Sequence, residues 1–210
     1  MTDRLYICIK KMTMTKAEKT RQFIIEKSAS IFNTKGIAAT AMSDIATATT
    51  LTKGSLYVHF ENKEELSLYA VDYNLEKFAS KTLDAISIAS TAKEKLFGIL
   101  DFLSDPINHP IEGGCPMINF GTEADDTNPP IRNKIIQAME DSIGLISSII
   151  EEGKINGEFL PDWDTASYAI KMYATIEGGV MICRVIGSSK NMKMIVESLK
   201  NEIESMSTQK

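Results

Sequence analysis

The stretch LTKGSLYVHFENKEEL, residues 51–66, predicts a short helix that leads through a tight corner into a longer one. Thr52 is a residue type that caps helices. Leu56 and Phe60, four residues apart, share one face of the helix that follows and are expected to face inward. Asn62 is a second cap and opens the longer helix.

The residues before this stretch predict two more helices. A capping box begins at Thr15, an apolar stripe follows, and Gly36 ends the helix, which we expect over about 16–34. Thr40 caps a short helix that ends near Ala48, because the threonines that follow compete for the backbone. Two short helices joined by a turn of about three residues are typical of a helix-turn-helix.

In a helix-turn-helix, the first residues of the second helix reach base edges in the major groove of DNA. Thr52, Lys53 and Ser55 occupy those positions, and Gly54 lets the backbone come close. Three further side chains can donate hydrogen bonds to phosphates, namely Tyr57, His59 and Lys63. The pattern therefore predicts a DNA-binding surface on this helix.

The basic residues are concentrated in the same part of the chain. The 210 residues carry a formal net charge of −5, yet residues 1–66 hold ten Lys and Arg against seven Asp and Glu. A basic front on an acidic protein indicates an anion-facing module joined to a second part. Charge alone leaves a solvated helix face as the alternative.

The segment TAMSDIATATTLTKGSLYVHFENKEEL, residues 40–66, resembles the DNA-binding signature of the TetR/AcrR family of transcriptional regulators. The resemblance implies an all-α protein of about nine helices. It places a helix-turn-helix DNA-binding domain at 15–61, after a flexible tail at 1–14, and a ligand-binding and dimerisation domain at 62–210.

The resemblance also implies roles for single residues. Thr40 and Ser43 would flank the DNA backbone, while Tyr57, His59 and Lys63 would contact phosphates. One position departs from the family pattern, since a threonine stands in the turn where the family usually has glycine. A β-branched residue is ill suited to a positive φ, so we expect the turn at Thr50 to differ in detail.

Capping and periodicity predict further helices downstream, at about 63–88, 91–103, 130–154, 164–186 and 190–206. Between them, GGCPMINFGTEADD, residues 113–126, resembles a stretch of one TetR-family branch, in which a short helix leads to an acidic end. The acidic residues here are Glu123, Asp125 and Asp126. We expect a ligand to meet moving structure in this segment.

Large or adaptable side chains in the C-terminal helices predict a pocket for an apolar or aromatic effector. They are Phe97, Phe102, Met117, Phe120, Trp163, Tyr168, Met172 and Tyr173. Plain core packing is the alternative for most of them. The resemblance implies a repressor that such an effector releases from DNA, with the fourth helix as the coupling element.

Ala174, Gly178 and Ile182 form a thin face on the helix expected over 164–186. A mid-helix glycine costs about 1 kcal/mol relative to alanine, and close approach of another helix would offset that cost. The resemblance extends to YATIEGGVMICRVIGSSKNM, residues 173–192, and implies a four-helix dimer core. We therefore expect a homodimer on a double-stranded inverted-repeat operator.

Two other classes of function stay open. An enzyme could use Cys115 as nucleophile, His109 as base and Glu123 as orienting group, although nothing in the sequence sets their geometry. A helical adaptor without DNA binding is the second. A metal site built from His109, Glu112 and the acidic residues matches no familiar ligand spacing, so we expect no metal, no cofactor and no catalysis.

The sequence also predicts a cytoplasmic protein that does not enter a membrane. We find no run of about 18 uncharged apolar residues. Cys8, Cys115 and Cys183 lie far apart, which is typical of a reducing compartment and argues against a disulfide framework.

Overall fold

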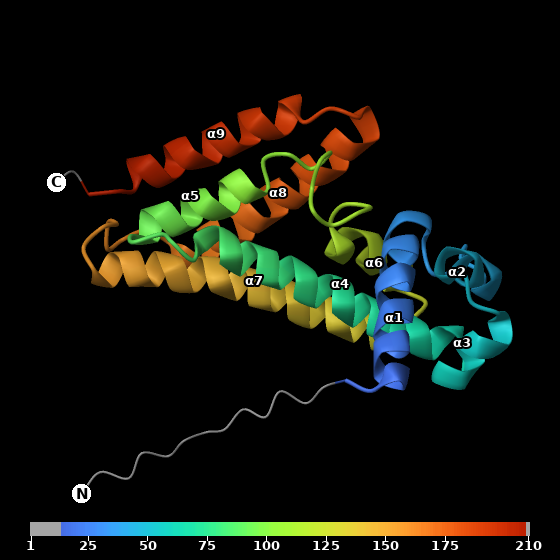
Figure 1. Ribbon diagram of the computed structural model, residues 1–210. Coiled ribbons are helices and arrows are strands. Elements are labelled where there is room, and N and C mark those ends of the chain that lie inside the picture. The colour runs from blue at the N-terminus through green and yellow to red at the C-terminus, as the bar shows by residue number, and fades with distance from the viewer. Residues whose placement is uncertain (1–13, 209–210) are drawn as a thin grey trace, which may run out of the picture.

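The computed structural model describes residues 14–208, which form nine helices and no sheet (Figure 1). The helices are α1 (Lys16–Lys35), α2 (Met42–Thr49), α3 (Lys53–His59), α4 (Lys63–Ile86), α5 (Ala92–Phe102), α6 (Pro116–Ala124), α7 (Pro129–Ile155), α8 (Thr165–Ile186) and α9 (Lys190–Ser205). The predicted all-α fold is confirmed. Apart from Met14, the predicted tail at 1–14 lies outside the described residues.

The helices α1, α2 and α3 form a small unit on which the first half of α4 packs (Figure 1). Leu56 and Phe60 are buried at its centre, as predicted from their spacing. The Arg21 guanidinium lies over the rings of Phe60 and Tyr69, 4.4 Å and 4.0 Å from their centroids, and pairs with Glu65 at 3.1 Å. One α1 side chain therefore ties α1 to both α3 and α4.

Thr50 ends α2 in the left-handed conformation, with φ 57° and ψ 23°. The N–H of Leu51 donates to the carbonyl of Ala46 at 3.2 Å, the bond that glycine-ended helices commonly form. The expected difference at this turn is therefore wrong, because the surrounding structure holds Thr50 in the conformation that a glycine would adopt. Such strain costs on the order of 1 kcal/mol or more.

The cap of α2 also differs from the prediction. Its N-cap is Ala41, whose N–H donates to Asp44 at 3.0 Å. Thr40 is buried instead, and its hydroxyl donates to the carbonyl of Gly36 at 2.6 Å. The acidic side chain in the first turn therefore replaces the predicted threonine cap.

The remaining helices form a second body around the far half of α4. Helix α4 runs from the small unit alongside α7, and α9 lies over α8 and α5 (Figure 1). Helix α6 contacts α1 on one side and α4 and α7 on the other. Within residues 14–208, no helix is long and apolar enough to cross a membrane.

Candidate functional site

The first turn of α3 is exposed to solvent. Thr52, Lys53 and Gly54 are exposed, and Tyr57 is 51% exposed one turn later. Thr52 caps the helix as predicted, because its hydroxyl accepts the N–H of Ser55 at 3.1 Å. Four further residues of the predicted surface are half-buried: Ser43, Ser55, His59 and Lys63.

Gly54 has no packing role that requires a glycine. A Cβ placed on it would meet only the Thr52 hydroxyl, at 3.8 Å, and the residue lies within the regular helix α3. Glycine in a helix costs about 1 kcal/mol relative to alanine. The fold of the protein therefore does not require a glycine at this position. The missing side chain leaves the helix backbone open at its exposed start, which would allow DNA to approach closely.

The loop between α1 and α2 is held from α4 by Lys63. Its ammonium donates to the carbonyls of Ile37 and Thr40 at 3.0 Å and 3.1 Å. The ammonium group of Lys63, which we predicted to contact a DNA phosphate, thus also makes two hydrogen bonds within the protein. Since Thr40 is buried, its side chain lies off the exposed surface where the resemblance places a DNA contact.

The same loop is held from α6 by Glu123. Its two carboxylate oxygens accept the N–H groups of Ile37 and Ala38 at 2.9 Å and 2.6 Å. The sequence predicted an acidic end to this helix but not its partners. Because α6 begins beside the pocket described below, one short helix joins the pocket to the helix-turn-helix unit.

A second set of bonds joins the end of α1 to the loop before α6. The buried Asn33 side chain donates to the carbonyls of Glu112 and Gly114 at 2.7 Å and 3.1 Å. Asn119 on α6 donates back to the carbonyl of Asn33 at 3.0 Å. Gly113 has φ +92°, and a Cβ there would come within 2.6 Å of the Asn33 carbonyl, so this contact requires glycine.

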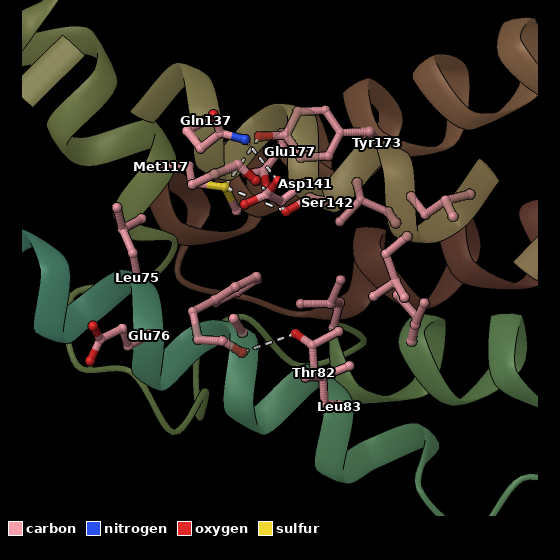
Figure 2. Close-up of a pocket in the computed structure, with 18 of the residues that line it drawn as sticks. Leu75, Glu76, Thr82, Leu83, Met117, Gln137, Asp141, Ser142, Tyr173 and Glu177 are labelled. Atoms are coloured by element: carbon pink, nitrogen blue, oxygen red, sulfur yellow. Dashed lines mark hydrogen bonds between the residues drawn. The ribbon is translucent and has the colours of Figure 1, made fainter. Parts of the chain in front are cut away.

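A cavity of about 510 Å³ lies mainly between α4, α6, α7 and α8 (Figure 2). Two of the eight predicted pocket residues, Met117 and Tyr173, line it. Its walls also include side chains that the sequence did not single out, among them Leu75, Phe78, Thr82, Asp141, Ile176 and Glu177. The repeated spacing of three or four residues on α4, from Leu75 to Thr82, is the signal in the sequence that could have identified this face.

The other six predicted pocket residues do not line this cavity. Phe97, Phe102, Phe120, Trp163, Tyr168 and Met172 all lie elsewhere. The Trp163 ring packs between Phe159 and Tyr168, with centroids 4.9 Å and 4.8 Å away. The Tyr168 hydroxyl donates to the carbonyl of Leu199 on α9. Trp163 and Tyr168 therefore pack the corner where α7, α8 and α9 meet.

Glu177 is the most perturbed carboxyl of the cavity wall. Its burial raises the pKa to about 7, an effect that the bond from the Cys115 thiol to Oε1 at 3.3 Å partly offsets. The Cys115 thiol is itself buried, and burial followed by the nearby Glu177 charge raises its pKa well above the usual value. A thiol in this state is a poor nucleophile.

The three residues of the suggested catalytic group have separate partners. His109 is stacked against Phe78 and accepts the N–H of Ile111, and burial lowers its pKa to about 4. Glu123 binds loop amides at the opposite end of α6 from Cys115. Among residues 14–208, no group of three His, Cys, Asp or Glu side chains could hold a metal ion.

Helix-turn-helix geometry with an exposed second helix, joined to a helical body with a ligand-sized cavity, defines a DNA-binding transcriptional regulator. The model of the bacterial regulatory proteins, tetR family, matches residues 24–70. The model of the tetracyclin repressor-like C-terminal domain matches residues 92–199. The chain therefore belongs to the TetR family.

Solved structures and a curated relative agree with this assignment. A TetR-family regulator from Cytophaga hutchinsonii is 36% identical, with a TM-score of 0.85 over 94% of this chain and 100% of its own. One from Chloroflexus aurantiacus is 33% identical, with a TM-score of 0.88 over 92% of this chain and 98% of its own. The repressor DhaR from Mycobacterium sp. (strain GP1) is 25% identical over 79% of this chain and 82% of its own length.

Proposed function

We propose that this regulator binds an inverted-repeat operator as a homodimer in the cytoplasm and represses transcription until a small effector with an apolar or aromatic body releases it. The observation that carries the proposal is the exposed start of α3. There, Lys53 and Tyr57 are exposed beside Gly54, which no internal contact requires to be glycine. Side chains that are free of internal packing beside a flat backbone suit a groove of DNA.

Dimerisation is supported by the outer face of α8. The predicted residues Ala174 and Ile182 are exposed there, and Gly178 has no neighbour within 4 Å of a Cβ built on it. Val185 continues the face and is 83% exposed. An apolar stripe of this length is favoured at interfaces between chains. A two-fold dimer built on it would present two α3 helices to half-sites about 34 Å apart.

Release by an effector has two supports in the fold. Met117, at the start of α6, lines the cavity, and Glu123, near its end, holds the loop before α2. Helix α4 lines the cavity as well and holds the same loop through Lys63. A ligand that moves either helix would move the helix-turn-helix unit. The sequence-based expectation named α4 alone, and we add α6 as a second coupling element.

Electrophoretic mobility shift with DNA fragments that flank the gene tests operator binding. Retardation is expected to weaken steeply between about 50 and 200 mM salt, because phosphate contacts release counterions. Gly54→Ala is expected to raise the melting temperature, since alanine favours the helix. It should weaken DNA binding about tenfold or more, because overpacking a close contact costs typically 1–3 kcal/mol.

The matched control is Gly144→Ala on α7, where a Cβ would meet nothing within 4 Å. It should stabilise the protein in the same way and leave DNA affinity unchanged. Sedimentation analysis of the free protein should give the mass of a dimer. Wild-type DNA affinity in Gly54→Ala would contradict the assigned groove contact. If the wild-type protein shifted none of the DNA fragments, the adaptor function would be favoured.

A further inference from the structure

The charges around the cavity are unbalanced. Asp72, Glu76, Asp141 and Glu177 all line it, against one lysine, Lys134. The Lys134 ammonium already pairs with both oxygens of Asp72, at 2.7 Å and 2.8 Å. Three carboxyl groups of the wall are therefore left without a lysine or arginine partner in the lining.

Glu177 is the carboxyl group in this set that is withdrawn from water. Its Oε1 accepts the Cys115 thiol, a weak donor, and its Oε2 is buried with no hydrogen-bond partner among the residues of 14–208. A buried polar atom without a partner costs free energy. The smaller cavity on the other side of Glu177 has no lysine or arginine among its lining residues, and its histidine, His109, is kept neutral by burial and by the Arg184 charge, which lower its pKa to about 4.

Most of the rest of the wall is apolar and partly aromatic, with Thr82, Gln137 and Ser142 as its uncharged polar residues. Figure 2 shows Glu177, Asp141 and Tyr173 gathered on one side of the pocket, with Leu75 and Leu83 on α4 across from them. Phe78 adds a second aromatic side chain to the lining. Aromatic faces attract organic cations as well as apolar groups. A bare metal ion suits these walls poorly, because it prefers several oxygen or nitrogen ligands at once.

We propose that the effector is an organic cation, an amine or quaternary ammonium on an apolar body of ligand size, with its positive group against Glu177. This inference rests on the proposed effector-binding function and narrows the class of effector. The apolar body would occupy the space between α4 and α7, and the cation would supply the partner that Glu177 lacks. A cation at this point lies one helical turn from Tyr173 on α8 and beside Cys115 at the start of α6.

Isothermal titration calorimetry in the absence of DNA tests the charge preference with three probes that share one apolar body. They are 4-phenylbutylamine, 4-phenylbutanol and 4-phenylbutanoate, which are cationic, neutral and anionic at neutral pH. The amine is expected to bind about tenfold or more tightly than the alcohol, because hydrogen bonds to charged groups are the stronger ones. The carboxylate should bind most weakly.

Glu177→Gln keeps the shape of the side chain and removes its charge. It should reduce the preference for the amine over the alcohol to about twofold, because the cationic group loses its anionic partner. The control is Glu76→Gln, at an exposed position of the same lining, which should keep most of the preference.

Several outcomes would overturn the inference. They are equal affinity for amine and alcohol, failure of the amine to bind at millimolar concentration, and a preference that survives in Glu177→Gln. Equal affinities would mean that the Glu177 carboxyl is satisfied from the smaller cavity and does not select the ligand. Because no DNA is present, each of these results leaves operator binding, and so the proposed regulatory function, to be judged separately.

Discussion

The two ends of the molecule treat their charged groups in opposite ways. In the unit of α1 to α3, the half-buried carboxylate of Asp44 is paired with Lys35 and accepts the N–H of Ala41. At the cavity, Glu177 is largely buried, and one of its oxygens has no partner among the described residues. Water solvates the charged groups at the DNA-binding end before DNA binds. At the cavity, the Glu177 carboxyl is desolvated in the free protein, and a ligand could offset the free-energy cost of that desolvation.

The largest expected effect is the pH dependence of stability that the desolvated Glu177 carboxyl causes. The Glu177 pKa rises from 4.5 to about 7 in the folded state, chiefly through burial. The folded protein therefore binds more protons than the unfolded chain between those values, and stability falls as pH rises through that window. Above it, the loss is on the order of 3 kcal/mol.

Glu177→Gln should remove this loss, so the variant should exceed the wild type in stability near pH 8 and approach it near pH 5. Urea unfolding as a function of pH measures the difference. The exposed Glu76→Gln variant serves as the control and should follow the wild type at both values. If the free energy of unfolding depended on pH in the same way in Glu177→Gln and the wild type, Glu177 would carry no desolvation cost, and the two ends of the molecule would not differ in this respect.

The next effect concerns the connection between the ends. Glu123→Gln should weaken the hold of α6 on the loop before α2, because the carboxylate accepts from Ile37 and Ala38 with separate oxygens. An amide has only one acceptor oxygen, so one of these two bonds is lost and the other is no longer charge-assisted. Amide hydrogen exchange at these two residues should accelerate about tenfold, which corresponds to about 1.4 kcal/mol. Any compound that binds the cavity should then release DNA less effectively.

The control for this variant is Asp126→Asn, an exposed carboxyl just after the same helix. It should leave both the exchange rates and the DNA response unchanged. If Glu123→Gln exchanges like the wild type, the carboxylate does not hold the loop, and coupling would pass through α4 alone.

The smallest effect concerns strain within the DNA-binding end. Thr50→Gly should stabilise the protein by about 1 kcal/mol, because glycine adopts the left-handed conformation without steric cost. Thr47→Gly, in the regular part of the same helix, should destabilise it. Thermal unfolding of the pair distinguishes the two, and a loss of stability in Thr50→Gly would show that the threonine hydroxyl contributes more than the strain costs.

Much of the DNA-binding end could be predicted because many of its contacts join residues that are only a few positions apart in the sequence. Thr52 caps α3 through Ser55, and Leu56 and Phe60 turn inward on one helix face. Capping and helical spacing are local rules, so residue order is enough to apply them. The local rules failed at Thr40, which is buried and does not cap α2, and at Thr50, which adopts the left-handed conformation despite its β-branched side chain.

The pocket could be predicted only in outline. The two predicted residues that line the cavity, Met117 and Tyr173, come from α6 and α8, while most of the lining comes from α4 and α7. Met172 and Tyr173 are neighbours in sequence, yet one is in the packed core and the other lines the cavity. Which of two adjacent side chains faces the cavity depends on how α8 is rotated against its neighbours, and residue type does not report that rotation.

By itself, the sequence determined the helices and the helix-turn-helix, because caps, glycine ends and apolar spacing act within a few residues. The class of protein came from the resemblance of residues 40–66 to the TetR/AcrR signature. The tertiary structure alone decided that Glu123 and Lys63 hold the same loop and that Glu177 is buried beside a cavity. Those features join residues from separate helices. Their partners and their cost follow from packing, which no local pattern encodes.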